Sequence, residues 1–198
     1  KSAGLSDQQI LQHIGASETA VEGIFFPDTY YFIKGSSDLD ILQRAYKTMQ
    51  NHLQNYWSER VESLPLNTPY EALILASIIE KETGAESDRA EIAGVFINRL
   101  RKGMKLQTDP TVIYGLGEQF DGNLRKKDLL ADQEYNTYTR AGLPPTPISL
   151  PSLASIRAAL NPAETDALYF VAKGNGESEF STNLADHNKA VNKYQKQQ

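Results

Sequence analysis

The segment from Leu73 to Gly84 constrains the fold most, because it is almost entirely apolar until its last turn. Thr68-Pro69-Tyr70-Glu71 predicts where its helix begins, with a capping box and a proline in the first helical position. Gly84 predicts where that helix ends. A helix that is apolar on all sides must be buried, and this one is shorter than the ~20 residues that a membrane helix needs. The sequence therefore predicts a globular domain that buries this helix.

Length and composition agree with a globular domain. The chain has 198 residues, of which 40% are hydrophobic and 23% charged, so it can bury a sizeable core and is neither disordered nor collagen-like. Its formal net charge of −5 lacks the electrostatic signature of a non-specific nucleic-acid binder, so we expect no nucleic-acid partner. The absence of cysteine excludes disulfides, thiolate nucleophiles, zinc fingers and iron–sulfur clusters.

Hydrophobic periodicity predicts a mainly helical chain with a few short strands. The other expected helices begin at Ser6, at a cap on Asp38, at Ser87, at Ser152 and at Leu184, with a helical turn over 111–116. We expect short strands around a turn within 22–35, a buried strand over 168–171 with a hairpin turn after it, and a stiff proline-rich loop over 142–151. The predicted class is α+β, with 1–66 as an N-terminal subdomain and 67–198 as the core.

Motifs for common catalytic chemistries are missing. The three histidines, His13, His52 and His187, have no zinc-hydrolase spacing, and there is no Gly-x-Ser-x-Gly elbow. The glycine pairs at 115–117 and 174–176 lack the strand-to-helix context of a nucleotide loop. We therefore expect neither a metal nor a cofactor.

Two glutamates end the apolar helix, and they differ in environment. Residues two positions apart point about 200° apart around a helix, so Glu80 and Glu82 face opposite ways. Glu82 shares the bulkier apolar face with Leu75, Ile78 and Ile79, close to the helix C-terminus. Burial and the helix dipole would both raise its pKa, as a general acid for glycosidic-bond cleavage requires. The alternative is that both glutamates are ordinary last-turn residues paired with Lys81 or Arg89.

Amide, hydroxyl and aromatic side chains gather in three further clusters. Such groups bind sugars, because rings stack on pyranose faces while amides bond to hydroxyl and N-acetyl groups. Each residue could equally cap a turn or a helix. The candidates, as substrate contacts or as supports for them, are Asn98, Gln107, Asp109, Tyr114, Asn136, Tyr138, Asn183 and His187.

Several of these segments together resemble one known family. Leu75-Ala76-Ser77-Ile78-Ile79-Glu80-Lys81-Glu82-Thr83 is similar to the signature of the YceG/MltG-type endolytic murein transglycosylases. Further similar segments follow in the same order from Glu22 to Tyr194, and they include 22–30, 95–100, 106–115, 135–138, 142–145, 159–162, 168–171 and 182–188.

The resemblance implies a lyase that cuts the MurNAc–GlcNAc bond of peptidoglycan strands and leaves 1,6-anhydro ends. Lytic transglycosylases place their acid in a Glu-Ser/Thr pair at a helix end, which Glu82-Thr83 matches and Glu80-Lys81 does not. The resemblance therefore implies Glu82 as the catalytic acid and base on a lytic-transglycosylase-like helix, with Glu80 as the second candidate.

The same resemblance implies a location and partners. Family members usually carry a membrane helix and a LysM-like segment ahead of this domain, and neither is complete in the sequence. We expect a protein anchored at the periplasmic face of the bacterial inner membrane, with peptidoglycan glycan strands as its substrate and cell-wall synthesis enzymes as further partners. Two alternatives stay open. One is a non-catalytic peptidoglycan-binding module, and the other is a pyridoxal-phosphate-dependent aminodeoxychorismate lyase, a label that family members have also carried.

Overall fold

The computed structural model describes residues 4–195 and is mainly helical. Its elements are α1 (Asp7–Ile14), α2 (Asp38–Ser58), α3 (Pro69–Glu82), α4 (Glu86–Arg101), α5 (Asp109–Leu116), the 3-10 turn η1 (Gly117–Gln119), α6 (Lys126–Leu130), α7 (Leu153–Leu160), β1 (Tyr169–Ala172), β2 (Ser178–Ser181) and α8 (Leu184–Tyr194). The predicted α+β class is confirmed.

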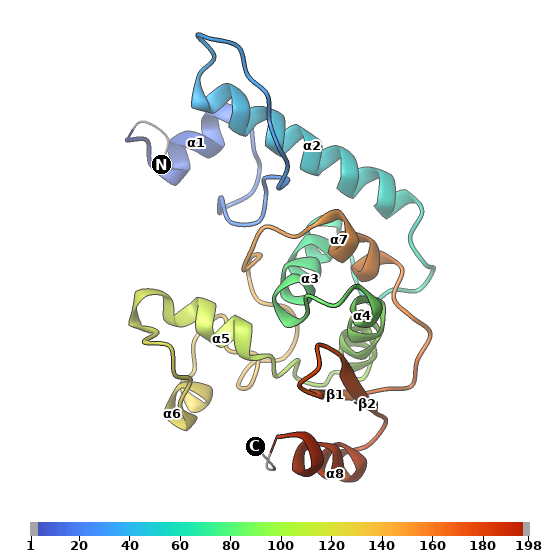
Figure 1. The fold of residues 1–198 in the computed structure, drawn as a ribbon. Helices are drawn as coiled ribbons and strands as arrows, with labels where there is room; N and C mark the ends of the chain where they lie inside the picture. Colours follow the sequence, from blue (N-terminus) through green and yellow to red (C-terminus); the bar gives the residue numbers. More distant parts are fainter. Residues whose placement is uncertain (1–3, 196–198) are drawn as a thin grey trace.

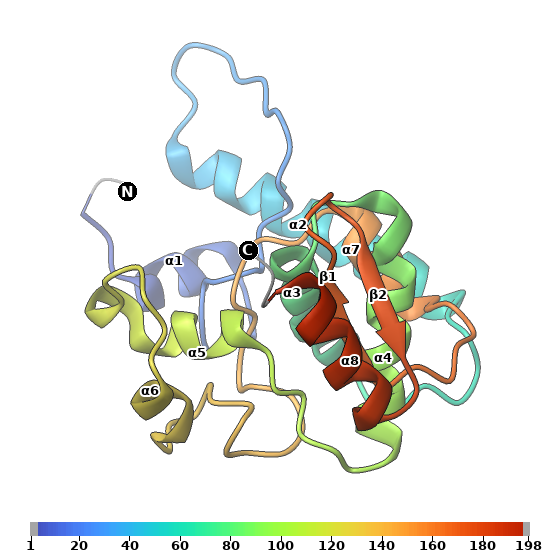
Figure 2. The same ribbon diagram turned by 60° about the horizontal axis from the view of Figure 1, so that its bottom comes forward.

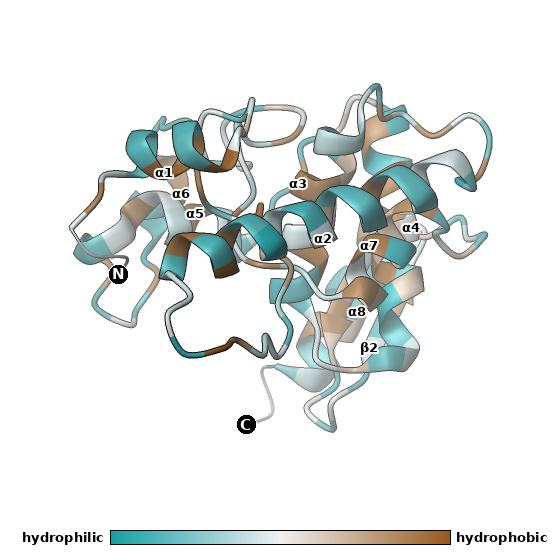
Figure 3. Ribbon diagram, turned by 90° about the horizontal axis from the view of Figure 1, so that it is seen from above, coloured by the Kyte–Doolittle hydropathy of each residue, from teal (hydrophilic) through white to brown (hydrophobic). Residues whose placement is uncertain are grey.

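Helix α3 runs through the centre of the molecule, as its apolar sequence requires. Its residues from Ala72 to Ile79 are all buried. Helices α2, α4, α5 and α7 pack around it (Figure 1). The outer side of α2 is largely hydrophilic, while α3 and α7 behind it are hydrophobic (Figure 3). Burial of the α3 side chains therefore organises the core.

The ends of α3 are set locally. Thr68 Oγ1 accepts a hydrogen bond from the Glu71 amide at 3.2 Å. The Glu71 carboxylate reaches back to the Asn67 amide at 2.6 Å rather than to Thr68, so the expected capping box is displaced by one residue. At the other end the backbone of Thr83 is already extended. Glu82 is therefore the last helical residue, two positions before the predicted stop.

The predicted strands within 22–35 are wrong. This segment contains no strand. Ile24 is buried in the core, and the chain beyond it loops away from the body between α1 and α2 (Figure 2). Tyr31 and Ile33 are 85% and 81% exposed, because no neighbouring strand pairs with them. Hydrogen bonds to α2 hold the loop instead, from the Phe26 amide to the Ala45 carbonyl at 3.1 Å and from Arg44 to the Tyr31 carbonyl at 2.7 Å.

Helix starts also differ from the sequence predictions. Ser37, not Asp38, caps α2, because its hydroxyl accepts from the Asp40 amide. Helix α4 begins at Glu86, with Ala85 as a cap that has no side-chain bond. The short helix α6, in the basic run 125–127 and just after it, was not predicted.

The C-terminal part forms a hairpin covered by a helix. Strands β1 and β2 pair antiparallel, with Tyr169 opposite Ser181 and Ala172 opposite Ser178, so the predicted hairpin turn is confirmed. Only Val171 of β1 is buried, because the sheet has two strands and one covered face. Helix α8 packs on both strands and β1 contacts α4 (Figure 2). The hairpin is thereby held beside the core helices.

One hydrophobic core joins the two predicted subdomains. Met49 and Leu53 of α2 belong to the same buried cluster as Leu75 and Ile79 of α3. The division at residue 66 stays a prediction. Within residues 4–195, no helix combines the length and the apolar character needed to cross a bilayer.

Candidate functional site

Glu82 ends α3 at a network of buried threonines. Thr108 Oγ1 donates a hydrogen bond to Glu82 Oε1. The Thr108 amide donates to Thr137 Oγ1 at 3.1 Å, and Thr137 Oγ1 lies 2.9 Å from Thr111 Oγ1. Thr108 and Thr137 are 2% and 3% exposed. The carboxyl of Glu82 is therefore held by one donor whose own position is fixed.

Burial changes the acidity of Glu82. Loss of hydration raises the pKa of this half-buried carboxyl from 4.5 to about 7, with a further contribution from the negative charge of Asp109. The Thr108 hydroxyl and the Arg99 guanidinium oppose the shift without cancelling it. Glu82 therefore holds its proton near neutral pH and can donate it.

Arg99 on α4 is the buried positive charge nearest to this chemistry. It is 7% exposed, and it donates to the Leu168 carbonyl at 2.7 Å and to the Leu106 carbonyl at 2.8 Å. No carboxylate within residues 4–195 forms a salt bridge with it. Its charge is therefore available to stabilise Glu82 once that carboxyl has lost its proton.

A cavity of about 450 Å³ opens beside Glu82, between the hairpin and the loop after α4, and is called here the hairpin cavity. Helix α8 forms part of its wall. In the described part of the chain, no three His, Asp or Glu side chains converge to hold a metal ion. The residues that line the hairpin cavity include Glu82, Arg99, Gln107, Asp109, Tyr138, Tyr169, Leu184, His187 and Val191.

Asp109 and Tyr138 form a pair on the wall of the hairpin cavity. The Tyr138 hydroxyl donates to Asp109 Oδ1 at 2.5 Å. Burial, this hydrogen bond and the nearby carboxylates raise the pKa of Tyr138, so its hydroxyl stays protonated. Asp109 is the first residue of α5, where the helix dipole favours a negative charge. The pair presents a fixed carboxylate close to Glu82.

His187 and Tyr169 form a second pair. Their rings stack with centroids 5.2 Å apart, and the Arg99 guanidinium lies 5.0 Å from the Tyr169 ring. Burial, together with the charge of Arg99, lowers the pKa of His187, so the imidazole is neutral at neutral pH. Its Nδ1 is buried without a hydrogen-bond partner within residues 4–195. A flat, neutral surface therefore faces the hairpin cavity.

Glu80 has a structural role. Its Oε2 accepts hydrogen bonds from the Ser152 amide at 2.9 Å and from the hydroxyls of Ser152 and Ser155 at 2.6 Å each. Burial acts to raise the pKa of Glu80, but these bonds and Arg89 outweigh it and lower the pKa below its ordinary value. Glu80 therefore stays ionised and ties α3 to the start of α7.

Comparison with known proteins decides the family. The profile of the YceG-like family matches residues 2–193. The chain belongs to the YceG-like family. It is 45% identical over 175 residues to a Bacillus subtilis protein and 33% identical over 177 residues to one from Streptococcus pneumoniae, and both relatives are named endolytic murein transglycosylase.

A solved structure agrees with this membership. A crystal structure of a yceG-like protein from Listeria monocytogenes is 38% identical, with a TM-score of 0.77, and covers 92% of this chain and 62% of that chain. The sequence matches cover 88% and 86% of the chain but only 48% and 32% of the relatives. This YceG-like chain thus spans half or less of the curated relatives.

Five of the ten predicted site residues meet at one place in this YceG-like chain. Their side chains come from α3, the loop after α4, α5, the loop after α6, and α8. They are Glu82, Gln107, Asp109, Tyr138 and His187, and all line the hairpin cavity. Tyr114 lines a different cavity, together with Lys81 and Pro110.

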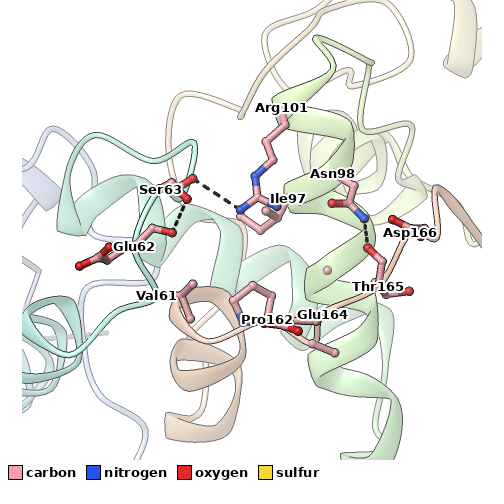
Figure 4. Close-up of a pocket in the computed structure, with 12 residues that line it drawn as sticks. Val61, Glu62, Ser63, Ile97, Asn98, Arg101, Pro162, Glu164, Thr165 and Asp166 are labelled. Atoms are coloured by element: carbon pink, nitrogen blue, oxygen red, sulfur yellow. Dashed lines mark hydrogen bonds between the residues drawn. The ribbon is translucent and has the colours of Figure 1, made fainter.

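Asn98 lies on another side of α4. Its amide donates to the carbonyls of Thr165 at 2.7 Å and Ala167 at 3.1 Å. Figure 4 shows it pointing to Thr165 in a separate cavity of about 700 Å³, where Arg101 reaches the Ser63 carbonyl. Asn98 does not line the hairpin cavity, so its role as a substrate contact or as a support for one stays a prediction. Its amide instead holds the segment that leads into β1.

Asn136 and Asn183 also serve the backbone. Asn136 is fully buried, and its Nδ2 donates to the Ala131 carbonyl at 2.7 Å and to two α6 carbonyls. Its Oδ1 accepts from the Tyr138 amide at 2.9 Å. Asn183 caps α8 by accepting from the Asp186 amide at 3.0 Å. The structure does not support either as a direct ligand contact.

Arg99 and Thr108 are the site residues that sequence reasoning left out of the candidates. Both belong to the polar cluster from which Asn98, Gln107 and Asp109 were chosen. An arginine among the buried residues of α4 was a usable signal, because a buried charge needs a reason. Thr108 carried no such signal, since its role depends on the approach of α3.

Proposed function

We propose that the chain is the catalytic part of an endolytic peptidoglycan lytic transglycosylase that cuts the MurNAc–GlcNAc bond and leaves 1,6-anhydro-MurNAc ends. The observation that carries the proposal is Glu82, a carboxyl with its pKa raised to about 7 beside a cavity lined with Tyr and His rings. Family membership and the names of the two relatives support the same reaction.

The proposed mechanism uses a single carboxyl group twice. Protonated Glu82 gives its proton to the glycosidic oxygen while the bond from that oxygen to the anomeric carbon of the muramic residue breaks. The resulting Glu82 carboxylate then takes the proton of the C6 hydroxyl of the same sugar, whose oxygen bonds to the anomeric carbon. No water is consumed, the 1,6-anhydro ring forms, and Glu82 is again protonated.

The neighbours of Glu82 fit these two steps. The Thr108 hydroxyl and the Arg99 charge stabilise the carboxylate that exists between proton donation and proton recovery. The Asp109 carboxylate, held by Tyr138, presents a negative charge where positive charge develops on the sugar ring. Burial raises the pKa of Glu82 enough for the acid form to be present at the start.

The test is to incubate the chain and its Glu82→Gln variant with uncrosslinked glycan strands and to identify product ends by mass spectrometry. We expect anhydro ends from the parent and at least a ~10³-fold loss in the variant, because Glu82 is the carboxyl of this cavity whose pKa is raised toward neutral. Glu80→Gln is the matched comparison. If Glu82→Gln keeps full activity, Glu82 is not the catalytic acid.

Three measurements separate the alternatives. Reducing ends would indicate a hydrolase, and strand binding without turnover, kept in Glu82→Gln, would favour a binding module. A change in the absorption spectrum on adding pyridoxal phosphate would favour the aminodeoxychorismate lyase reading.

The location and partners of the whole protein belong to this proposal. A transglycosylase acting on nascent strands would sit at the periplasmic face of the inner membrane, beside cell-wall synthesis enzymes. Fractionation and crosslinking of the full-length protein in cells would test both.

A further inference from the structure

Three buried threonines form a closed ring of hydrogen bonds around the backbone of Thr108. The Thr108 amide donates to Thr137 Oγ1 at 3.1 Å, and the Thr111 hydroxyl donates to the Thr108 carbonyl at 2.8 Å. Each hydroxyl has one proton, so Thr111 Oγ1 is left to accept from Thr137 Oγ1, which lies 2.9 Å away. The Thr108 carbonyl is a more distant acceptor for the Thr137 proton, at 3.4 Å. Both polar backbone groups of Thr108 are thereby held.

Thr137 also holds the residue before Thr108 in an unfavourable conformation. Gln107 has φ +51°, in the left-handed region that residues with a Cβ rarely adopt. Its amide donates to the Thr137 carbonyl at 3.1 Å. Thr137 therefore accepts from two successive amides, one through its backbone and one through its side chain. A backbone of this kind persists only where its surroundings fix it.

The hydroxyl of Thr108 does not have the role that its place in the fold would predict. Thr108 directly precedes α5, where a threonine side chain usually accepts from an amide of the first helical turn. Thr108 makes no such bond, and its hydroxyl donates to Glu82 Oε1 at the end of α3. This is the hydrogen bond that reaches the Glu82 carboxyl from the described residues 4–195.

We infer that Thr137 and Thr111 are positioning residues for the reaction, which hold the Thr108 hydroxyl against the Glu82 carboxyl. This inference rests on the proposed function, because it concerns how the same acid is prepared. While Glu82 is protonated, Oε1 accepts from Thr108 and the transferable proton sits on Oε2. After Oε2 has given that proton to the glycosidic oxygen, the Thr108 bond stabilises the carboxylate until the C6 hydroxyl returns a proton.

A purely structural role for the ring is the competing explanation. Buried hydroxyls that bond to the backbone would then serve only to join α5 to the loop after α6, which contains Thr137. Removing one of them would lower the free energy of unfolding. It would not change the acidity of Glu82.

The experiment compares Thr108→Val, Thr111→Val and Thr137→Val with Thr137→Ser. Valine keeps the branched shape of threonine and removes the hydroxyl, whereas serine keeps the hydroxyl. Thr146→Val is the matched control, because Thr146 is also buried, at 7% exposure, but its hydroxyl bonds to a carbonyl of the proline-rich loop.

Two readouts follow the acidity of Glu82. The first is the alkaline limb of kcat/KM, and the second is the titration of the Glu82 carboxyl by ¹³C NMR, which needs no turnover. The charged and titratable groups around Glu82 are Asp109 on α5, Arg99 on α4, Tyr138 in the loop after α6, and His187 on α8 across the hairpin cavity. None of the variants removes one of these groups.

The Thr108 bond lowers the pKa of Glu82, so its loss should raise that pKa. We expect Thr108→Val to move both readouts upward by about one pH unit and to lower kcat about 10²-fold. Thr111→Val and Thr137→Val should move them in the same direction by less and lower kcat about tenfold, with KM nearly unchanged. Thr137→Ser and Thr146→Val should move neither readout.

A double variant tests whether Thr137 acts through Thr108. In a Thr108→Val background, Thr137→Val should produce no further shift. A further shift there, or unmoved readouts in both Thr111→Val and Thr137→Val, would overturn the inference. If Thr137→Val does not fold, Thr111→Val gives the same test from the other side of the ring. If the parent makes no anhydro ends, the proposed function fails, and the NMR titration alone decides whether the ring controls Glu82.

Discussion

The functional contrast in this molecule lies between two glutamates separated by one lysine. Glu80 accepts three hydrogen bonds and stays ionised, whereas Glu82 accepts one and has its pKa raised to about 7. Burial and the number of hydrogen-bond donors at each carboxyl together decide which of the two glutamates can serve as an acid.

The raised pKa of Glu82 has a consequence for stability. Between pH 4.5 and about 7 the folded chain holds a proton on Glu82 that the unfolded chain has released. The free energy of unfolding therefore falls as pH rises through this window. Glu82→Gln removes this loss, so we expect the variant to be more stable than the parent at pH 8 by on the order of 1–3 kcal/mol, with a smaller difference at pH 4.

Urea unfolding at both pH values checks this stability prediction. Glu80→Gln is the comparison, and it should destabilise, because its hydrogen bonds favour the ionised form. An equal difference between Glu82→Gln and the parent at both pH values would contradict the raised pKa.

Arg99 is predicted to tune the acid. Its charge lowers the pKa of Glu82, so Arg99→Gln should raise that pKa further and move the alkaline limb of kcat/KM to higher pH. The activity at the optimum should fall about 10²-fold, because the intermediate carboxylate loses its buried positive partner. Arg99→Lys keeps the charge and should keep the limb closer to its original place. The pH dependence of kcat/KM measures this shift. If the alkaline limb of Arg99→Gln does not move, Arg99 contributes to packing and does not affect the pKa of Glu82.

At the scale of elements, short polar motifs position the helices that carry the site. The buried Asn136 amide joins the end of α6 to the Tyr138 backbone, while the exposed Asn183 caps α8. Both asparagines belong to motifs that resemble those of the family. Their contacts indicate that both asparagines support the local backbone.

Two substitutions test this architectural assignment. Asn136→Ala should cost about 2–3 kcal/mol of unfolding free energy, because it leaves buried carbonyls unpaired, and should lower activity through the displaced Tyr138. Asn183→Ala should cost only about 1 kcal/mol, the usual value of a helix cap, and should leave KM nearly unchanged. Urea midpoints and steady-state kinetics measure both. A large rise in KM with unchanged stability in either variant would restore a direct role in substrate binding.

For the whole molecule, the contact between the N-terminal loop and the proline-rich loop brings distant parts of the sequence together. Gly23→Ala should destabilise the chain by about 2 kcal/mol or more, because its Cβ would collide with Pro147. Gly35→Ala is a matched control, since Gly35 also has positive φ (+100°) but meets nothing within 4 Å. The difference between the two variants in thermal unfolding isolates the collision. Equal losses would mean that backbone strain alone matters.

The sequence by itself predicted most of the helices, and it placed Glu82 at the end of the apolar helix. The apolar run of α3, its Thr68–Pro69 start and the periodic stripes of α2 and α8 are local signals, and a helix closes its hydrogen bonds locally. The orientation of Glu82 followed from the same geometry, because 3.6 residues per turn place it with Ile78 and Ile79.

Only the tertiary structure decided the rest, because those outcomes depend on partners far away in the sequence. The segment over 22–35 had the composition of strands, but a strand needs a neighbour, and none lies beside it. The sequence did not distinguish Asn98, Asn136 and Asn183 from Gln107 and Asp109. In the structure the three asparagines bond to backbone carbonyls and amides, whereas Gln107 and Asp109 line the hairpin cavity. Whether a polar side chain binds the protein's own backbone or a ligand is settled by what packs against it.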